Sequence, residues 1–128
     1  MTKSRKSTVN VPHLGGIDAA YLMPEALDNS KPTLILIHGF MMSSEVYDKH
    51  YNSTFLKERV NLIGIDLLGH GETRTKNETF TYWDSAIMGL QVMEALGVKR
   101  SFVLGTSQGG WVAARMCLLA PDKVRVIR

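Results

Sequence analysis

A serine flanked by glycines, between a predicted strand and a predicted helix, constrains this chain more than any other feature. Ser107 lies in the segment 105–110, whose sequence is GTSQGG. Residues 101–104 favour a short buried strand, and residues 111–120 contain no glycine or proline and favour a helix. In this context a small-x-Ser-x-Gly pattern is typical of a nucleophile elbow, with glycines where a Cβ would collide with the neighbouring strand or helix. The alternative is a purely structural turn.

Strands and helices alternate along the rest of the chain. Residues 33–37 are apolar without alternation, which predicts a central parallel strand buried on both faces. Apolar residues spaced by three and four predict an amphipathic helix over 82–96. A hairpin around Gly15 and Gly16, an irregular helix after Ser43 or Ser44, and further strands complete the pattern; the ranges are 8–23 for the hairpin and 60–65 and 124–127 for the strands. The order predicts a three-layer α/β domain around a mostly parallel sheet.

The charge is concentrated at one end of the chain. Lys3, Arg5 and Lys6 are three of the 15 basic residues, and the other 12 balance 12 acidic residues. We therefore predict that residues 1–7 form a disordered basic tail, dispensable for stability, and that residues 8–128 form the folded domain. A neutral body offers no basic stripe for a phosphate backbone, so nucleic acid is not an expected partner.

Other features of the composition indicate the compartment and argue against bound metals. The first dozen residues lack an apolar signal segment, and no apolar run is long enough to cross a bilayer. The one cysteine, Cys117, cannot form an intramolecular disulfide. We therefore expect a cytoplasmic protein without a membrane partner. No cluster of Cys, His and Asp has ligand spacing, so neither a metal nor an organic cofactor is expected.

Three motifs in a fixed order indicate a family. The first is IHGF at 37–40, after the first buried strand; the second is DLLGHGET at 66–73, after the next; the third is the serine turn. Together they resemble the α/β-hydrolase superfamily, in its single-domain esterase, peroxidase and C–C hydrolase branch. The resemblance implies the three-layer α/β-hydrolase fold, with Ser107 as nucleophile and the backbone N–H groups of Phe40 and Gln108 as the oxyanion hole. It also implies structural roles for His38 and His70, and a loop-anchoring role for Asp66.

The chain departs from this family after Ser107. The family order places an acid and then a histidine beyond the serine, but only Asp122 follows here, with no histidine. Asp122 comes at the far end of the elbow helix and is expected on the surface. We therefore expect the N-terminal half of the fold, truncated after the sixth strand. A fragment, a truncated gene model or a degraded copy would explain this pattern.

The resemblance implies a serine hydrolase that acts on a small ester-like substrate by acyl transfer to Ser107, inactive as this chain alone. Serine at the elbow disfavours the dehalogenase and epoxide-hydrolase branches, which use a carboxylate nucleophile. The alternatives are a non-catalytic remnant or binding protein of the same fold, and a ligand-sensing member. Because later strands would cover the strand at 124–127, we also expect self-association through that exposed sheet edge.

Overall fold

The computed structural model describes residues 5–126, and within them seven strands form one sheet. The strand order is β1-β2-β4-β3-β6-β7, with β5 paired to β2 off this path. The strands are β1 (Ser7–Val11), β2 (Ile17–Leu22), β3 (Thr33–Ile37), β4 (Asn61–Ile65), β5 (Arg74–Thr75), β6 (Ser101–Gly105) and β7 (Val124–Val126). The pairs β3–β4, β3–β6 and β6–β7 are parallel, whereas β2 pairs antiparallel with β1, β4 and β5.

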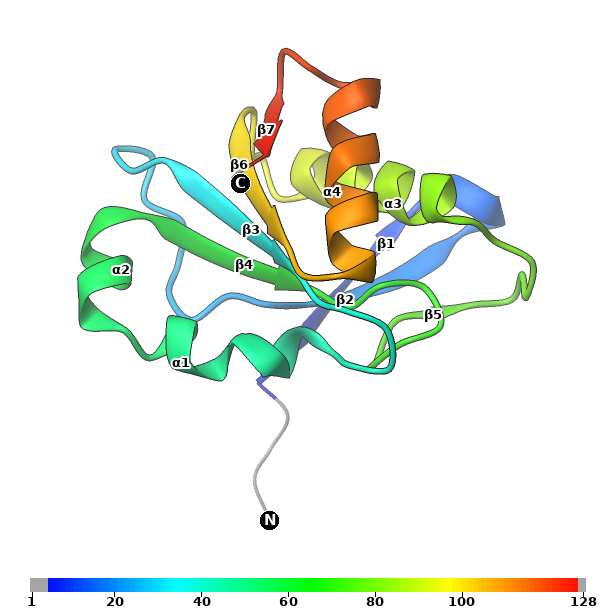
Figure 1. Cartoon of the computed structure of the whole chain (residues 1–128), viewed down its shortest axis with the longest axis horizontal. Helices are drawn as coiled ribbons and strands as arrows, with labels where there is room; N and C mark the ends of the chain where they lie inside the picture. Colours follow the sequence, from blue (N-terminus) through cyan, green and yellow to red (C-terminus); the bar gives the residue numbers. More distant parts are fainter. Residues whose placement is uncertain (1–4, 127–128) are drawn as a thin grey trace.

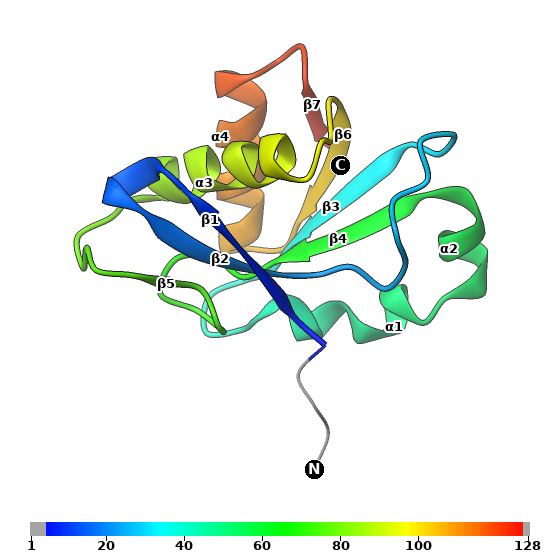
Figure 2. The same ribbon diagram turned by 180° about the vertical axis from the view of Figure 1, so that it is seen from behind.

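Helices cover both faces of the sheet (Figures 1 and 2). Helices α3 and α4 pack together on one face, and η2, α1 and α2 lie on the other. The helical segments are η1 (His13–Gly15), η2 (Ser44–Tyr47), α1 (Asp48–Tyr51), α2 (Thr54–Arg59), α3 (Tyr82–Ala95) and α4 (Gln108–Leu119). This is the truncated three-layer α/β-hydrolase arrangement that the sequence predicts.

The central strand explains the three layers. Along β3, Ile35 and Ile37 join the core cluster beneath α3 and α4, whereas Leu34 and Leu36 pack with Tyr51 on the other face. Every residue of β3 is buried, as its uninterrupted apolar sequence predicts. The carboxyl ends of β3, β4 and β6 meet near the start of α4, so the loops that follow these strands share one edge of the sheet.

The N-terminal hairpin begins at a residue that was predicted to belong to the disordered tail. The hairpin is present, but a five-residue connection that includes η1 replaces the expected two-glycine turn. Ser7 is the first residue of β1 and pairs with Tyr21, so it belongs to the sheet. Residues 1–4 of the predicted tail lie outside the described residues.

In the spatial order of the described strands, which leaves out β5, β7 is the sixth and last strand. Apolar surface is exposed at this end of the sheet. Phe102 on β6 is 42% exposed and Val126 on β7 is 37% exposed. Within residues 5–126, no strand pairs with the outer edge of β7. On α4, Trp111 and Leu118 are also exposed.

Candidate active site

The serine identified in the sequence lies where the sheet meets α4. β6 ends at Gly105 and α4 begins at Gln108, so Thr106 and Ser107 form the whole connection. Ser107 is exposed, with φ 54° and ψ −117°, a conformation that residues with a Cβ rarely adopt. This is the sharp strand-to-helix turn that the sequence predicts, and the connection from β6 to α4 lies at the carboxyl ends of the parallel strands (Figure 1).

Two glycines allow this turn to pack tightly. A Cβ on Gly105 would lie 2.2 Å from the carbonyl oxygen of Gly109, and a Cβ on Gly109 would lie 2.2 Å from that of Ile37. Neither approach is sterically possible, so the first turn of α4 lies directly against the ends of β6 and β3. A side chain at either position would therefore collide with the neighbouring helix or strand, as the sequence predicts.

The loop after β3 lies beside Ser107. A Cβ added to Gly39 would lie 3.5 Å from the Cβ of Ser107. The next residue, Phe40, is 65% exposed, whereas Gln108, which directly follows Ser107, is buried. Within residues 5–126, the backbone amides of Phe40 and Gln108 have no hydrogen-bond acceptor. Among the described residues, two unpaired backbone N–H groups therefore lie near this turn in the chain trace, one in the loop after β3 and one in the first residue of α4.

His38 is a buried structural residue. Its Nε2 accepts a hydrogen bond of 3.0 Å from the amide of Leu67, so the proton must be on Nδ1, which donates to the carbonyl oxygen of Gly39 at 2.7 Å. Burial lowers the pKa of His38 and outweighs the hydrogen bond to Gly39. A neutral imidazole with both nitrogens occupied has no lone pair available for a proton of Ser107.

His70 ties the turn after β4 to the loop after β3. Its Nε2 accepts a hydrogen bond of 3.1 Å from the amide of Met41, and its Nδ1 lies 2.9 Å from the carbonyl oxygen of Leu68. The Phe40 ring packs edge-on against it, with ring centroids 5.7 Å apart. His70 thus holds the loop that carries Phe40, in agreement with its predicted structural role.

The other titratable candidates are away from the serine. His13 pairs with Asp84 of α3 at 2.8 Å, and His50 packs against Tyr47. Asp122 is exposed beyond the C-terminal end of α4, as predicted. In the described part of the chain, no imidazole or carboxylate forms a hydrogen bond with the Ser107 side chain.

Asp66 anchors two loops, as the sequence suggests. It is fully buried; its Oδ1 accepts from the amide of Ser44 at 2.8 Å, and its Oδ2 accepts from the amide of Glu72 at 2.9 Å. A Cβ on Gly71 would lie 2.1 Å from Oδ2, so the turn requires glycine there. Burial would raise the pKa of Asp66, but the Lys6 ammonium and the two amides hold it below its ordinary value.

Two contacts in this region were not predicted from the sequence. Lys6, assigned to the disordered tail, is bound to Asp66 at 2.8 Å with its side chain only 3% exposed, so the tail assignment is wrong for this residue. The Tyr47 hydroxyl donates to the carbonyl oxygen of Ile37 at 2.8 Å and lies 2.6 Å from Thr106 Oγ1. Neither residue belongs to a recognisable motif, because its partners are distant in sequence.

The largest hollow among those described lies away from Ser107. It measures about 660 Å³ and lies beside the C-terminal end of α3, near Gly97 and Lys123. Within residues 5–126, no group of three or more His, Cys, Asp and Glu side chains is placed to bind a metal, and no helix has the length and apolarity required to cross a membrane.

Comparison with known proteins identifies the family. The family model for the alpha/beta hydrolase fold matches residues 32–127, so the chain belongs to that family. The pimeloyl-[acyl-carrier protein] methyl ester esterase of Nitrosomonas europaea is 37% identical over 98 residues, which cover 73% of this chain and 34% of the esterase.

Solved structures agree on the fold. A probable hydrolytic enzyme from Pseudomonas aeruginosa has a TM-score of 0.83 at 23% identity, covering 94% of this chain and 39% of the enzyme. A structure from a study of carboxylesterases of Nitrososphaera gargenis has a TM-score of 0.81 at 23% identity and covers 92% and 42%. The chain therefore spans between about a third and two fifths of the length of these relatives.

Proposed function

We propose that this chain carries the nucleophile half of a serine hydrolase active site. Ser107 attacks the carbonyl carbon of an ester-like substrate, and the N–H groups of Phe40 and Gln108 bind the oxygen that becomes negatively charged. The observation that carries the proposal is the strained backbone of Ser107 at the start of α4, with Gly39 beside it. The esterase of Nitrosomonas europaea supports an ester as the substrate class.

Turnover also requires a base. The four histidines of the chain all precede Ser107, and His38 and His70 use both ring nitrogens in loop contacts. The proposal therefore assigns the base and its acid partner to residues outside these 128. We also propose a cytoplasmic location for the protein. The alternative, a non-catalytic binding protein of this fold, is favoured by the same shortage of a base.

A cysteine at position 107 tests the nucleophile role without a base. A thiol is partly ionised near neutral pH, and a helix N-terminus favours its thiolate. In Ser107→Cys, p-nitrophenyl acetate should acetylate the introduced thiol at least about tenfold faster in the folded chain than in urea, since one oxyanion donor is worth about 10²–10³ in rate. Peptide mass spectrometry separates the introduced thiol from that of Cys117, which serves as the internal reference.

Iodoacetamide provides the matched control reaction, because alkylation at its CH₂ group develops no oxyanion. The folded-to-unfolded rate ratio should be larger for acetylation than for alkylation. Equal ratios would show an exposed thiol without an oxyanion hole and would favour the binding-protein alternative. The wild-type chain should show no p-nitrophenyl acetate turnover that is lost in Ser107→Ala.

A further inference from the structure

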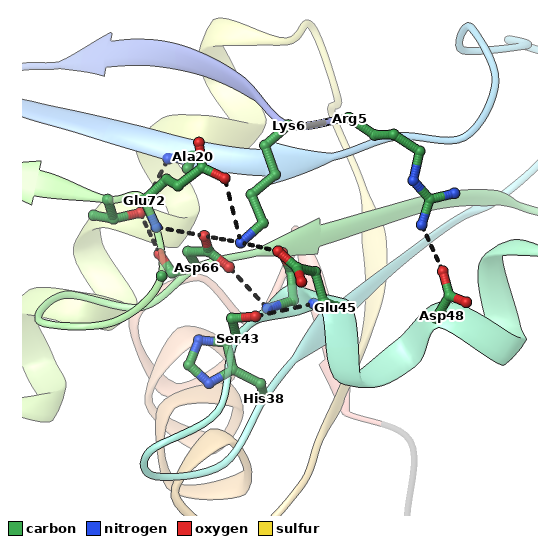
Figure 3. Close-up of polar contacts among 12 residues, drawn as sticks. Arg5, Lys6, Ala20, His38, Ser43, Glu45, Asp48, Asp66 and Glu72 are labelled. Atoms are coloured by element: carbon green, nitrogen blue, oxygen red, sulfur yellow. Dashed lines mark hydrogen bonds and ion pairs between the residues drawn. The ribbon is translucent and has the colours of Figure 1, made fainter. Parts of the chain in front are cut away.

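Lys6 reaches from the start of β1 into a group of carboxylates near the candidate site (Figure 3). Its Nζ lies 2.8 Å from Asp66 Oδ2, 3.0 Å from Glu45 Oε1 and 3.8 Å from Glu72 Oε2. The Lys6 and Asp66 side chains are 3% and 0% exposed. Removing one partner of such a buried pair leaves an uncompensated charge, which is strongly destabilising.

The Asp66 carboxylate holds together the loop after β3, which contains Gly39 beside Ser107, and the turn after β4. Ser44 closes the loop after β3, and its amide binds one carboxylate oxygen; Glu72 closes the turn after β4, and its amide binds the other. The same turn carries His70, which binds the amide of Met41. Lys6 thus contacts Asp66, and His70 contacts the residue after Phe40; the backbone of the turn after β4 joins Asp66 to His70.

We propose that Lys6 is a positioning residue for the candidate oxyanion loop, residues 39–42. Its ammonium keeps Asp66 charged, Asp66 fixes the turn after β4 against the loop after β3, and His70 in that turn sets the Phe40 amide beside Ser107. The inference rests on the proposed roles of Ser107 and Phe40. It gives the N-terminal segment a part in the site, although the segment lies about 100 residues before the serine.

The neighbouring residue offers a matched control. Arg5 pairs with Asp48, and both side chains are more than half exposed, at 55% and 57%. Arg5→Gln therefore removes one cation from the same segment without touching the Asp66 contacts. Lys6→Met removes the buried cation, and Lys6→Arg keeps a cation at that position.

The three substitutions are tested in the Ser107→Cys chain by two measurements. Lys6→Met should slow acetylation of the introduced thiol about tenfold, the effect of a misplaced oxyanion donor, while alkylation by iodoacetamide stays unchanged. Hydrogen exchange at the amides of Met41, Ser44 and Glu72 should become faster. Lys6→Arg should restore both measurements toward the parent values, and Arg5→Gln should change neither.

A folded Lys6→Met chain with parent acetylation rates and parent exchange at Met41 would overturn the inference. If Lys6→Met does not fold, the double variant Lys6→Met/Asp66→Asn removes the stranded charge as well, and it should fold with fast exchange at Met41; slow exchange there would refute the role of Lys6. If Ser107→Cys itself shows no preferential acetylation, the proposed function fails, and exchange at Met41 still decides whether Lys6 fixes the loop.

Discussion

The Tyr47 hydroxyl lies 2.6 Å from Thr106 Oγ1, so a side chain of η2 is bonded to the turn that carries Ser107. Tyr47 has one proton and donates it to the carbonyl oxygen of Ile37 at 2.8 Å. The Thr106 hydroxyl must therefore donate to Tyr47. This pair joins the end of β3 to the elbow across the face of the sheet opposite α4.

Tyr47→Phe should destabilise the chain by about 1–2 kcal/mol, because one buried and one partly buried hydrogen bond are lost. Urea unfolding measures the loss, and hydrogen exchange should become faster at the Thr106 amide. Tyr51→Phe is the matched control, since its hydroxyl binds the carbonyl oxygen of Ser44 instead. Tyr51→Phe should lower the free energy of unfolding similarly and leave the Thr106 amide protected from exchange. Equally fast exchange at the Thr106 amide in both variants would contradict a specific link between Tyr47 and the elbow.

The backbone strain at Ser107 predicts an unusual effect of glycine. At φ 54° and ψ −117°, Ser107→Gly should be more stable than Ser107→Ala by about 1 kcal/mol, since glycine adopts this conformation without steric cost. Ala114→Gly, at an exposed position in α4, should have the opposite sign and lose about 1 kcal/mol. Chemical denaturation of the three variants measures both differences, and a Ser107→Gly chain less stable than Ser107→Ala would argue against strain.

The buried pair predicts a loss of stability in acid. The pKa of Asp66 is below its ordinary value of 3.8, so its contribution to folding is present above that value and lost as the pH falls through the lowered pKa. Asp66→Asn should therefore flatten the fall in unfolding free energy below about pH 4. Burial raises the pKa of Asp84, but its contacts with Thr81 and His13 lower it below the ordinary value. Asp84 should therefore retain part of the pH dependence of the unfolding free energy. An unchanged slope in Asp66→Asn would contradict the ionised state assigned to Asp66.

The outer edge of β7 and the exposed Phe102 and Val126 predict self-association. Light scattering after size exclusion should show oligomers whose population grows with concentration. Val126→Lys places a charge on this edge and should shift the chain toward the monomer. Val46→Lys, at an exposed valine of η2, should have no such effect. A monodisperse wild-type monomer would rule out the edge as an association site.

The sequence predicted the features that depend on local pattern. The apolar run of β3, the spacing of α3 and the glycines around Ser107 each act over a few residues, and each predicted element is present. Lys6 was misassigned because a lysine near a terminus is ordinarily solvated, and its partner Asp66 is 60 residues away. Tyr47 and Thr106 are 59 residues apart, so only the folded sheet brings them together.

The most direct test of the central claim is a crystal structure of the Ser107→Cys chain acetylated at the introduced thiol. The thioester carbonyl oxygen should lie within hydrogen-bonding distance, about 2.7–3.2 Å, of the backbone nitrogens of both Phe40 and Gln108. A carbonyl oxygen that points into solvent, or that contacts neither amide, would contradict the assignment of this turn as a hydrolase nucleophile site.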